Sequence, residues 1–359
     1  MASAVANNKM LQMANMVNRK MHIHAFAARG PGAALRPFDY ELREPGPYEI
    51  DIEVSHCGVC HSDIHLIDND WNISHYPLVP GHEIVGAVGA TGVKVERVSV
   101  GQRVGVGWQS GSCLRCEWCL SGYENLCRNK VLTCVKRHGG FADFVRTDSR
   151  FAFTIPDSLD SASAAPLLCA GLTVYAPMRR FDLRPHHRVG IVGIGGLGHI
   201  ALQFAHALDC EVTAFSTHPQ KEEDSFAFGA DHFVNSVNEK EMQETKRTLD
   251  FILSTASTPL PWSSYMEALR PNGHLTIVNR LRSRGEVSSV AVPAPVLVGG
   301  QKSISGSLTG GRDVMREMLA FAASHHIVAR SEVFPQTDIN SAVQRVRNNE
   351  AHYRVVLET

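Results

Sequence analysis

A glycine-rich turn between an apolar run and an amphipathic run limits the fold of this chain more than any other feature. The apolar run 188–192 leads into six residues, Gly193 to Gly198, and apolar residues then recur at helical spacing up to Leu208. In such a turn Gly193 allows a tight change of direction, Gly195 lets the backbone approach a pyrophosphate, and Gly198 lets the helix pack closely on the strand. Because a helix N-terminus also attracts an anion, we predict a dinucleotide-binding unit. The alternative is a purely structural turn.

The segments around this turn predict two domains, in keeping with a length of 359 residues. From about 171 to 307 strand-like runs alternate with helical patterns, which is typical of a parallel, doubly wound α/β sheet. From about 21 to 145 short β-branched runs alternate with Gly and Pro, which predicts a β-rich domain. The expected strands are 48–54, 84–88, 102–106, 141–145, 188–192, 211–215, 251–253, 274–278 and 353–357, and the expected helices are 197–208, 262–269 and 313–325.

These patterns give the following expected boundaries. Residues 1–20 form an N-terminal tail, 21–170 together with 308–359 form the β-rich domain, and 171–307 form the Rossmann dinucleotide-binding domain. The segment 1–20 contains no acidic residue and carries three cations, which faintly resembles a transit peptide. We favour the alternative of a frayed tail.

The residues after the second strand of the dinucleotide unit indicate which nicotinamide cofactor binds. NAD-selective folds place an acid about 20 residues after the glycine turn, where it takes the ribose 2′-hydroxyl. Here Ser216, Thr217 and Lys221 occupy this region, and the first acid is Glu222. Two hydroxyls and a cation suit a 2′-phosphate, so NADP is favoured over NAD. The alternative is that Lys221 only begins a solvated, charged helix.

Four of the nine cysteines lie within fifteen residues. Their sequence order is Cys113, Cys116, Cys119 and Cys127. In a chain without a secretory signal this clustering indicates a metal rather than disulfides, and therefore a reducing, cytoplasmic location. Four thiolates fill a tetrahedral zinc ion completely, so the site would be structural and would hold a long loop together. A disulfide or iron–sulfur site is the alternative.

A second set of possible ligands is dispersed along the chain. It comprises Cys57 and Cys60, then His82 and Glu83, then Cys169. Taken separately these pieces are ambiguous, since Cys57 and Cys60 could be a redox pair and Cys169 a buried core thiol. A zinc ion held by two thiolates and one imidazole, with an open fourth position for substrate oxygen, would unite them.

Charge and hydropathy argue against two classes of partner. The 35 Lys and Arg residues nearly balance the 36 Asp and Glu residues, so the formal charge of −1 provides no field to attract nucleic acid or anionic lipid. Apolar runs fall short of the roughly 20 residues that span a bilayer. We therefore expect neither a nucleic-acid nor a membrane partner.

From about Met21 to the C-terminus the chain resembles the zinc-dependent medium-chain alcohol dehydrogenases, most closely the cinnamyl alcohol dehydrogenase branch with its broad-range aldehyde reductases. The resemblance rests on 57–63, 76–83, the four-cysteine loop, 166–175, the glycine turn and 303–307. It implies a GroES-like catalytic domain beside a Rossmann domain, a homodimer, two zinc ions per chain, and hydride transfer between NADP(H) and primary alcohols or aldehydes.

The resemblance also implies roles for individual residues. Cys60, His82 and Cys169 would ligate the catalytic zinc, with Glu83 as an alternating fourth ligand or a supporting carboxylate. Ser62 would contact the substrate oxygen and begin a proton relay that ends at His65, while Asp70, Trp71 and Trp108 would line the substrate channel. The expected cofactor contacts are Thr173, Gly193, Gly195, Gly196, Leu197, Gly198, Ser216, Thr217, Lys221, Thr255 and Ser307.

Two other functions remain open at this stage. A polyol or sugar dehydrogenase of the same superfamily would favour NAD and an acid near residue 216, where this chain has none. A non-catalytic dinucleotide sensor would be suggested by loss of Cys60, His82 or Ser62, and all three are present. One departure from the family pattern is Asn279-Arg280, which stands where a glycine is common.

Overall fold

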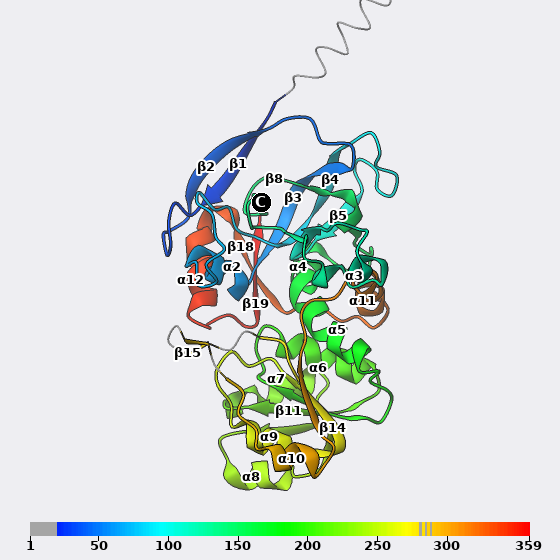
Figure 1. The fold of residues 1–359 in the computed structure, drawn as a ribbon. Coiled ribbons are helices and arrows are strands. Elements are labelled where there is room, and N and C mark those ends of the chain that lie inside the picture. The colour runs from blue at the N-terminus through cyan, green and yellow to red at the C-terminus, as the bar shows by residue number, and fades with distance from the viewer. Residues whose placement is uncertain (1–19, 280–281, 284–285, 288) are drawn as a thin grey trace, which may run out of the picture.

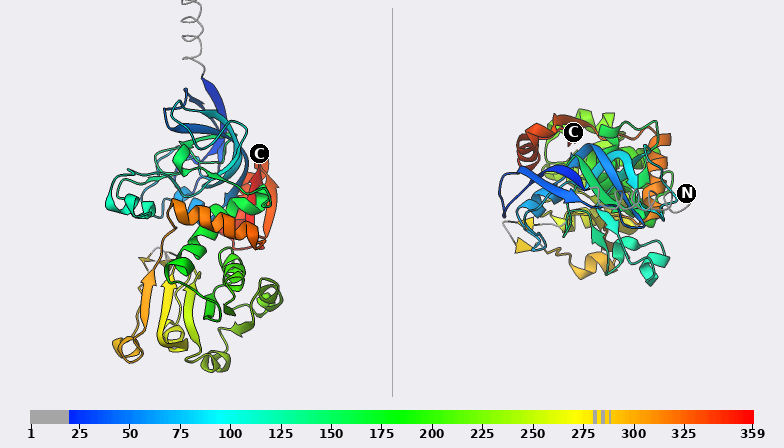
Figure 2. Two further views of the ribbon diagram at one scale, coloured as in Figure 1. Left: turned by 90° about the vertical axis from the view of Figure 1, so that its right-hand side faces the viewer. Right: turned by 90° about the horizontal axis from the view of Figure 1, so that it is seen from above.

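The computed structural model describes residues 20–279, 282–283, 286–287 and 289–359. The predicted tail, apart from Lys20, and Arg280 lie outside the described residues. In the described part, two large sheets lie one above the other, and α11 (Arg312–Ser324) and a long helix cross between them (Figures 1 and 2). The long helix is the continuous stretch Ser161–Arg180.

The lower sheet confirms the predicted doubly wound fold. Its six strands are parallel and lie in the order β12-β11-β10-β13-β14-β17. In chain order this is 3-2-1-4-5-6, the Rossmann arrangement, whose direction of winding reverses between β10 and β13. The strands are β10 (Arg188–Val192), β11 (Glu211–Ser216), β12 (His232–Asn235), β13 (Leu249–Ser254), β14 (Leu269–Ile277) and β17 (Ser303–Gly306).

Helices lie at the three expected places, and the sequence reasoning missed the others, among them the long helix Ser161–Arg180. The predicted helices at 197–208, 262–269 and 313–325 correspond to α6, α9 and α11. The bounds are α6 (Gly198–Ala207), α7 (Glu222–Ala227), α8 (Glu239–Glu244), α9 (Trp262–Ala268) and α10 (Ala294–Val298), with the short helix η4 (Pro219–Lys221) before α7.

The upper sheet is built from both ends of the chain. Its path is β18-β19-β3-β4-β5-β9, and β8 pairs with β3. The C-terminal strand β19 runs antiparallel to β3, with Val355 opposite Val59, so the predicted return of the C-terminus to the first half of the chain is confirmed. The strands are β3 (Glu49–Val59), β4 (Glu83–Thr91), β5 (Arg103–Val106), β8 (Phe144–Asp148), β9 (Phe153–Thr154), β18 (Ser331–Pro335) and β19 (Arg354–Glu358).

Smaller elements surround the upper sheet. The hairpin of β1 and β2 lies at the end of the upper sheet that faces away from the lower sheet (Figure 1). The predicted strand at 141–145 begins later, at Phe144, because Phe141 instead accepts a loop hydrogen bond from Phe26 N at 2.9 Å. The elements are β1 (Met21–Ala27), β2 (Arg36–Leu42), α2 (His61–Ile67), β6 (Gln109–Gly111), α3 (Glu117–Leu120), η1 (Glu124–Leu126), β7 (Val131–Leu132), η2 (Ser149–Phe151), β15 (Arg282–Ser283), β16 (Glu286–Val287), η5 (Gln336–Asp338) and α12 (Ile339–Arg347).

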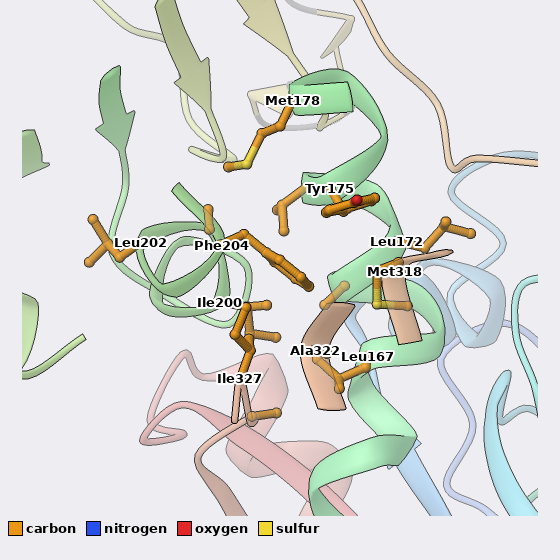
Figure 3. Packing of buried hydrophobic residues seen from close by; sticks show 14 of the residues in the cluster. Leu167, Leu172, Tyr175, Met178, Ile200, Leu202, Phe204, Met318, Ala322 and Ile327 are labelled. Carbon is orange, nitrogen blue, oxygen red and sulfur yellow. The ribbon is translucent and has the colours of Figure 1, made fainter. Parts of the chain in front are cut away.

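The long helix Ser161–Arg180 forms the core between the two sheets. It comprises α4 (Ser161–Pro166), the π-helical turn η3 (Leu167–Gly171) and α5 (Leu172–Arg180). Figure 3 shows Tyr175 and Leu172 of this helix packed beside Phe204 of α6 and Met318 of α11. By length and composition alone the helix could cross a membrane, contrary to the expectation that apolar runs are too short, but 78% of its apolar window is buried inside the protein.

Candidate active site and metal centres

Four potential ligands from distant parts of the chain meet at the base of the upper sheet. Cys60 follows β3, His82 and Glu83 lie at the start of β4, and Cys169 lies in the π-helical turn η3. Their ligand atoms all lie within 4.8 Å of one another, and all four side chains are buried. Two thiols, an imidazole and a carboxylate are a donor set that suits zinc. The structure therefore brings the dispersed set together, and Cys57 lies instead in the sheet core.

Asp63 holds this ligand cluster in place. One carboxylate oxygen accepts from Gly81 N and lies 2.9 Å from His82 Nδ1, and the other accepts from Cys60 N at 3.0 Å. Because Nδ1 faces Asp63, the Nε2 atom of His82 is directed at the cluster, 3.3 Å from Cys169 Sγ. Sequence reasoning did not assign Asp63 a role. The signal was an acid three residues after a ligand at a helix start, the capping-box position.

The two cluster thiols behave as a pair. The hydrogen bond from Cys169 lowers the pKa of Cys60 well below its usual range, and the same contact raises the pKa of Cys169. The cluster therefore already favours one thiolate, the form that binds a metal.

Arg354 connects this cluster with the glycine turn. Its Nη2 atom lies 2.5 Å from both carboxylate oxygens of Glu83, and both side chains are buried. A Cβ atom on Gly196 would lie 3.1 Å from Arg354 Nη1, so the guanidinium also borders the turn. Sequence reasoning missed Arg354, because a single arginine in a C-terminal strand carries no local signal.

The predicted relay residues lie on one face of α2. Ser62 N donates to Cys60 Sγ at 3.5 Å, and His65 lies three residues further on, which places both side chains on the same side of the helix. His65 Nδ1 lies 2.6 Å from Asp70 Oδ2. Asp70 was predicted to line the channel, and the structure pairs it with His65.

Two tryptophans extend from this relay to the ligand cluster. The ring of Trp71 lies 5.1 Å from that of His65 and meets the ring of Trp108 edge-on at 5.8 Å. The ring of Trp108 in turn meets that of His82 edge-on at 4.8 Å. Trp71 and Trp108, two of the three predicted channel residues, therefore form one aromatic wall beside the candidate metal site.

The four clustered cysteines form a second, separate group. Their sulfur atoms lie within 4.8 Å of one another, and Cys116 caps the short helix α3. The pKa of Cys113 is lowered to about 6, mainly by a hydrogen bond from the backbone of Arg115, and this favours the thiolate form. The segment 113–127 that carries these cysteines, called the four-cysteine lobe below, is fixed to α11 by the buried Glu124. Its Oε1 atom lies 2.7 Å from Arg312 Nε. This closed set of thiols fits the structural zinc site that the spacing predicts.

The glycine turn has the geometry predicted for a dinucleotide site. Gly193 adopts a φ of +90°, and its carbonyl accepts from Thr255 Oγ1 at 2.6 Å. A Cβ on Gly198 would lie 2.0 Å from Gly193 O, so the close packing of helix on strand requires glycine there. A Cβ on Gly195 would meet nothing within 4 Å, which leaves this side of the turn open. The turn and Thr255 both lie at the reversal point of the sheet.

The other expected cofactor contacts lie on several elements of the lower sheet and on α5. Lys221 Nζ donates to Ile194 O at 2.5 Å rather than to Ser216 or Thr217. Ser216 Oγ accepts from His218 N, and Thr217 Oγ1 lies 2.8 Å from His218 Nδ1. Thr173 is buried near the start of α5, and Ser307 follows β17, the edge strand that pairs with β14. Asn279 donates to Thr255 O at 2.6 Å, a contact that sequence reasoning missed.

Comparisons with known proteins agree with this arrangement. Residues 46–157 match the alcohol dehydrogenase GroES-like domain family, and 196–324 match the zinc-binding dehydrogenase family. An aldehyde reductase from Synechocystis is 43% identical over 335 residues, covering 93% of this chain and 98% of its own.

Two solved structures share the fold. A cinnamyl alcohol dehydrogenase of Sorghum bicolor superposes with a TM-score of 0.88 at 36% identity, covering 94% of this chain and 98% of the other. The CAD of Helicobacter pylori, complexed with NADP(H), superposes with a TM-score of 0.87 at 30% identity, covering 95% of this chain and 99% of the other. With its GroES-like and zinc-binding dehydrogenase domains, this chain belongs to the zinc-dependent alcohol dehydrogenase family.

Proposed function

We propose that this protein is an NADP-dependent zinc alcohol dehydrogenase that works as an aldehyde reductase of broad aromatic and aliphatic range. The observation that carries the proposal is the buried group of Cys60, His82, Cys169 and Glu83, joined through Arg354 to an open glycine turn. Metal ligands and a dinucleotide turn at one junction suit a reaction between a bound carbonyl and a nicotinamide.

The two sulfur-containing clusters would have different tasks. Cys60, His82 and Cys169 would hold the catalytic zinc, with Glu83 as an alternating fourth ligand, and Cys113, Cys116, Cys119 and Cys127 would hold the structural zinc. When bound, the catalytic zinc would polarise the carbonyl oxygen and NADPH would supply the hydride. Asp63 would keep the His82 ring oriented through the reaction.

The chain's own residues would deliver the proton. Ser62 stands beside Cys60 at the start of α2, so its hydroxyl would donate to the substrate oxygen as negative charge develops there. Asp70 holds Nδ1 of His65, which leaves Nε2 as the atom that exchanges the proton with Ser62 or solvent. Asp70 would thus act by orienting His65, and the wall of Trp71 and Trp108 would receive the apolar part of the substrate.

The residues around the glycine turn would select NADP. Gly193, Gly195, Gly196, Leu197 and Gly198 would surround the pyrophosphate, Thr173 would pack at the nicotinamide, and Thr255 and Ser307 would lie along the cofactor. Ser216, Thr217 and Lys221 would contact the 2′-phosphate, since no acid occupies residues 216 to 221. The half-buried Lys221 supports this role, because its ammonium already lies against the turn at Ile194.

We further propose that the domain boundaries are those predicted, with 21–170 and 308–359 in one domain and 171–307 in the other. We also propose that the protein is cytoplasmic and forms a homodimer. Strand β17 is the last strand on one side of the parallel sheet, and the exposed Val298 and Leu308 flank it. Pairing of two such edges would continue the sheet and cover these side chains. None of the nine cysteines, all of which lie in the described part of the chain, forms a disulfide, which supports a reducing compartment. Sedimentation velocity would test the dimer.

Initial rates test the function directly. We expect reduction of benzaldehyde, cinnamaldehyde and medium-chain aliphatic aldehydes with NADPH, with kcat/KM at least about tenfold higher than with NADH, because a charge-assisted phosphate contact contributes about 1.5 to 3 kcal/mol. Lys221→Glu should remove the preference while Thr217→Ala reduces it less. If polyols were oxidised with NAD faster than any aldehyde is reduced with NADPH, the proposal would be wrong and the polyol alternative correct.

A further inference from the structure

Lys221 ends η4 and has an acidic neighbour on the next helix, α7, that could neutralise it. Asp224 lies three residues further along the chain, in the first turn of α7. The charge of Asp224 raises the pKa of Lys221, against the larger lowering by burial, so the two groups are close enough to interact. Within the described part of the chain, however, the Lys221 ammonium donates a hydrogen bond to Ile194 O and lies over the ring of Tyr353. It makes no hydrogen bond to Asp224.

Both carboxylate oxygens of Asp224 are engaged by residues from the C-terminal part of the chain. Oδ2 accepts from Tyr353 Oη at 2.6 Å, and Oδ1 accepts from Arg330 Nη1 at 2.8 Å. Tyr353 directly precedes β19, and Arg330 directly precedes β18, so both donors approach the Rossmann sheet from the upper sheet. Both oxygens of Asp224 are therefore engaged by donors other than Lys221.

Tyr353 is itself firmly held at this junction. Its ring stacks on His199 at 5.0 Å and meets Phe228 edge-on at 5.3 Å. The backbone N–H of Arg330 donates to His199 Nε2 at 3.2 Å, while His199 Nδ1 donates to Gly195 O at 2.9 Å. The ammonium of Lys221 lies 5.5 Å from the centre of the Tyr353 ring, within the range of a cation–π contact.

From this geometry we infer that Tyr353 and Arg330 are positioning residues for cofactor selectivity, which keep Asp224 from pairing with Lys221 and so leave the ammonium available to a 2′-phosphate. The inference rests on the proposed NADP preference and extends it. A carboxylate and a phosphate compete for the same cation, so withdrawal of the carboxylate strengthens binding of the phosphate. The device acts on the 2′-phosphate and not on the rest of the dinucleotide.

The test measures binding of 2′,5′-ADP and of ADP by calorimetry, without turnover. Tyr353→Phe keeps the ring but frees Oδ2 of Asp224, and should weaken 2′,5′-ADP about two- to fivefold, the range of a competing ion pair of surface strength. ADP binding should not change, because ADP lacks the 2′-phosphate. Adding Asp224→Asn to Tyr353→Phe should restore the affinity for 2′,5′-ADP, a rescue that a purely structural role for Tyr353 does not produce.

A matched control removes a similar hydrogen bond elsewhere. Tyr175 donates to Glu317 Oε1 at 2.8 Å, so Tyr175→Phe also deletes a tyrosine–carboxylate hydrogen bond. This variant should leave the affinities for 2′,5′-ADP and for ADP unchanged. Should Tyr353→Phe fold poorly, Arg330→Met frees the other oxygen of Asp224 and carries the same expectation. Equal binding of both ligands by the unmodified protein would overturn the proposed cofactor preference. A selective parent whose Tyr353→Phe variant binds 2′,5′-ADP normally, or is not rescued by Asp224→Asn, would overturn this inference alone.

Discussion

Two alanine substitutions in the glycine turn separate its role in folding from its role in binding. At Gly198 a Cβ would lie 2.0 Å from Gly193 O, so helix and strand must separate by about 1 Å, and overpacking of this kind lowers stability by about 1 to 3 kcal/mol. At Gly195 a Cβ would meet nothing within 4 Å, and the residue is not among the glycines with positive φ. Gly195→Ala should therefore leave the free energy of unfolding unchanged or raise it by about 0.4 to 1 kcal/mol.

The effect on NADPH binding should be the reverse of the effect on stability, because the stable variant Gly195→Ala should be the one that binds weakly. The space in front of Gly195 is where the pyrophosphate is expected, so the added methyl group should weaken NADPH at least about tenfold, or about 1.4 kcal/mol. Fluorescence titration with NADPH and denaturant unfolding of the cofactor-free protein would measure both quantities for each variant. The reasoning fails if Gly195→Ala binds NADPH normally, or if it destabilises the protein as much as Gly198→Ala does.

The remaining predictions concern the metal clusters and the substrate wall. Cys116→Ser should lose one zinc per chain and lower the midpoint of thermal unfolding by about 5 °C or more, because the lobe lacks its own core. His82→Ala should lose the other zinc and all turnover in a folded protein; metal analysis that finds a single zinc in the active parent contradicts both. Ser62→Ala should reduce kcat about 100-fold for every substrate, since it removes proton delivery, and an unchanged kcat would exclude the relay. Trp71→Ala should raise KM more for benzaldehyde than for hexanal. An equal change in both KM values would show that Trp71 does not contact the aromatic substrate.

Local patterns were sufficient to predict the parts of the fold that depend on local physics. The glycine turn, β10 and α6 form one continuous segment, so spacing and periodicity identified them correctly. The four-cysteine lobe is also contiguous in sequence, and its sulfur atoms meet as predicted. The family resemblance was needed for the dispersed ligands, because Cys60 and Cys169 are separated by 109 residues, 169 − 60, and nothing in their spacing brings them together.

Contacts that form only in the folded chain account for what was missed. The resemblance assigned Asp70 to the substrate channel, and its hydrogen bond to His65, five residues earlier, was not predicted. Asp63 was quoted within a motif but received no role, because its value lies in three simultaneous contacts to Gly81, His82 and Cys60. Arg354 and Tyr353 were seen merely as part of a terminal strand.

The terminal strand β19 explains why metal site and cofactor turn form one unit. It pairs with β3, the strand that leads to Cys60, so its first residue is fixed relative to the metal ligands. From there Arg354 reaches Glu83 and borders Gly196, and the preceding Tyr353 contacts His199 and Asp224 on the Rossmann side. Two adjacent residues thus tie the candidate metal ligands to the glycine turn and to the region of Lys221. Because hydride transfer requires nicotinamide and carbonyl within a few tenths of an ångström of the productive geometry, the rigidity of this strand is part of the site.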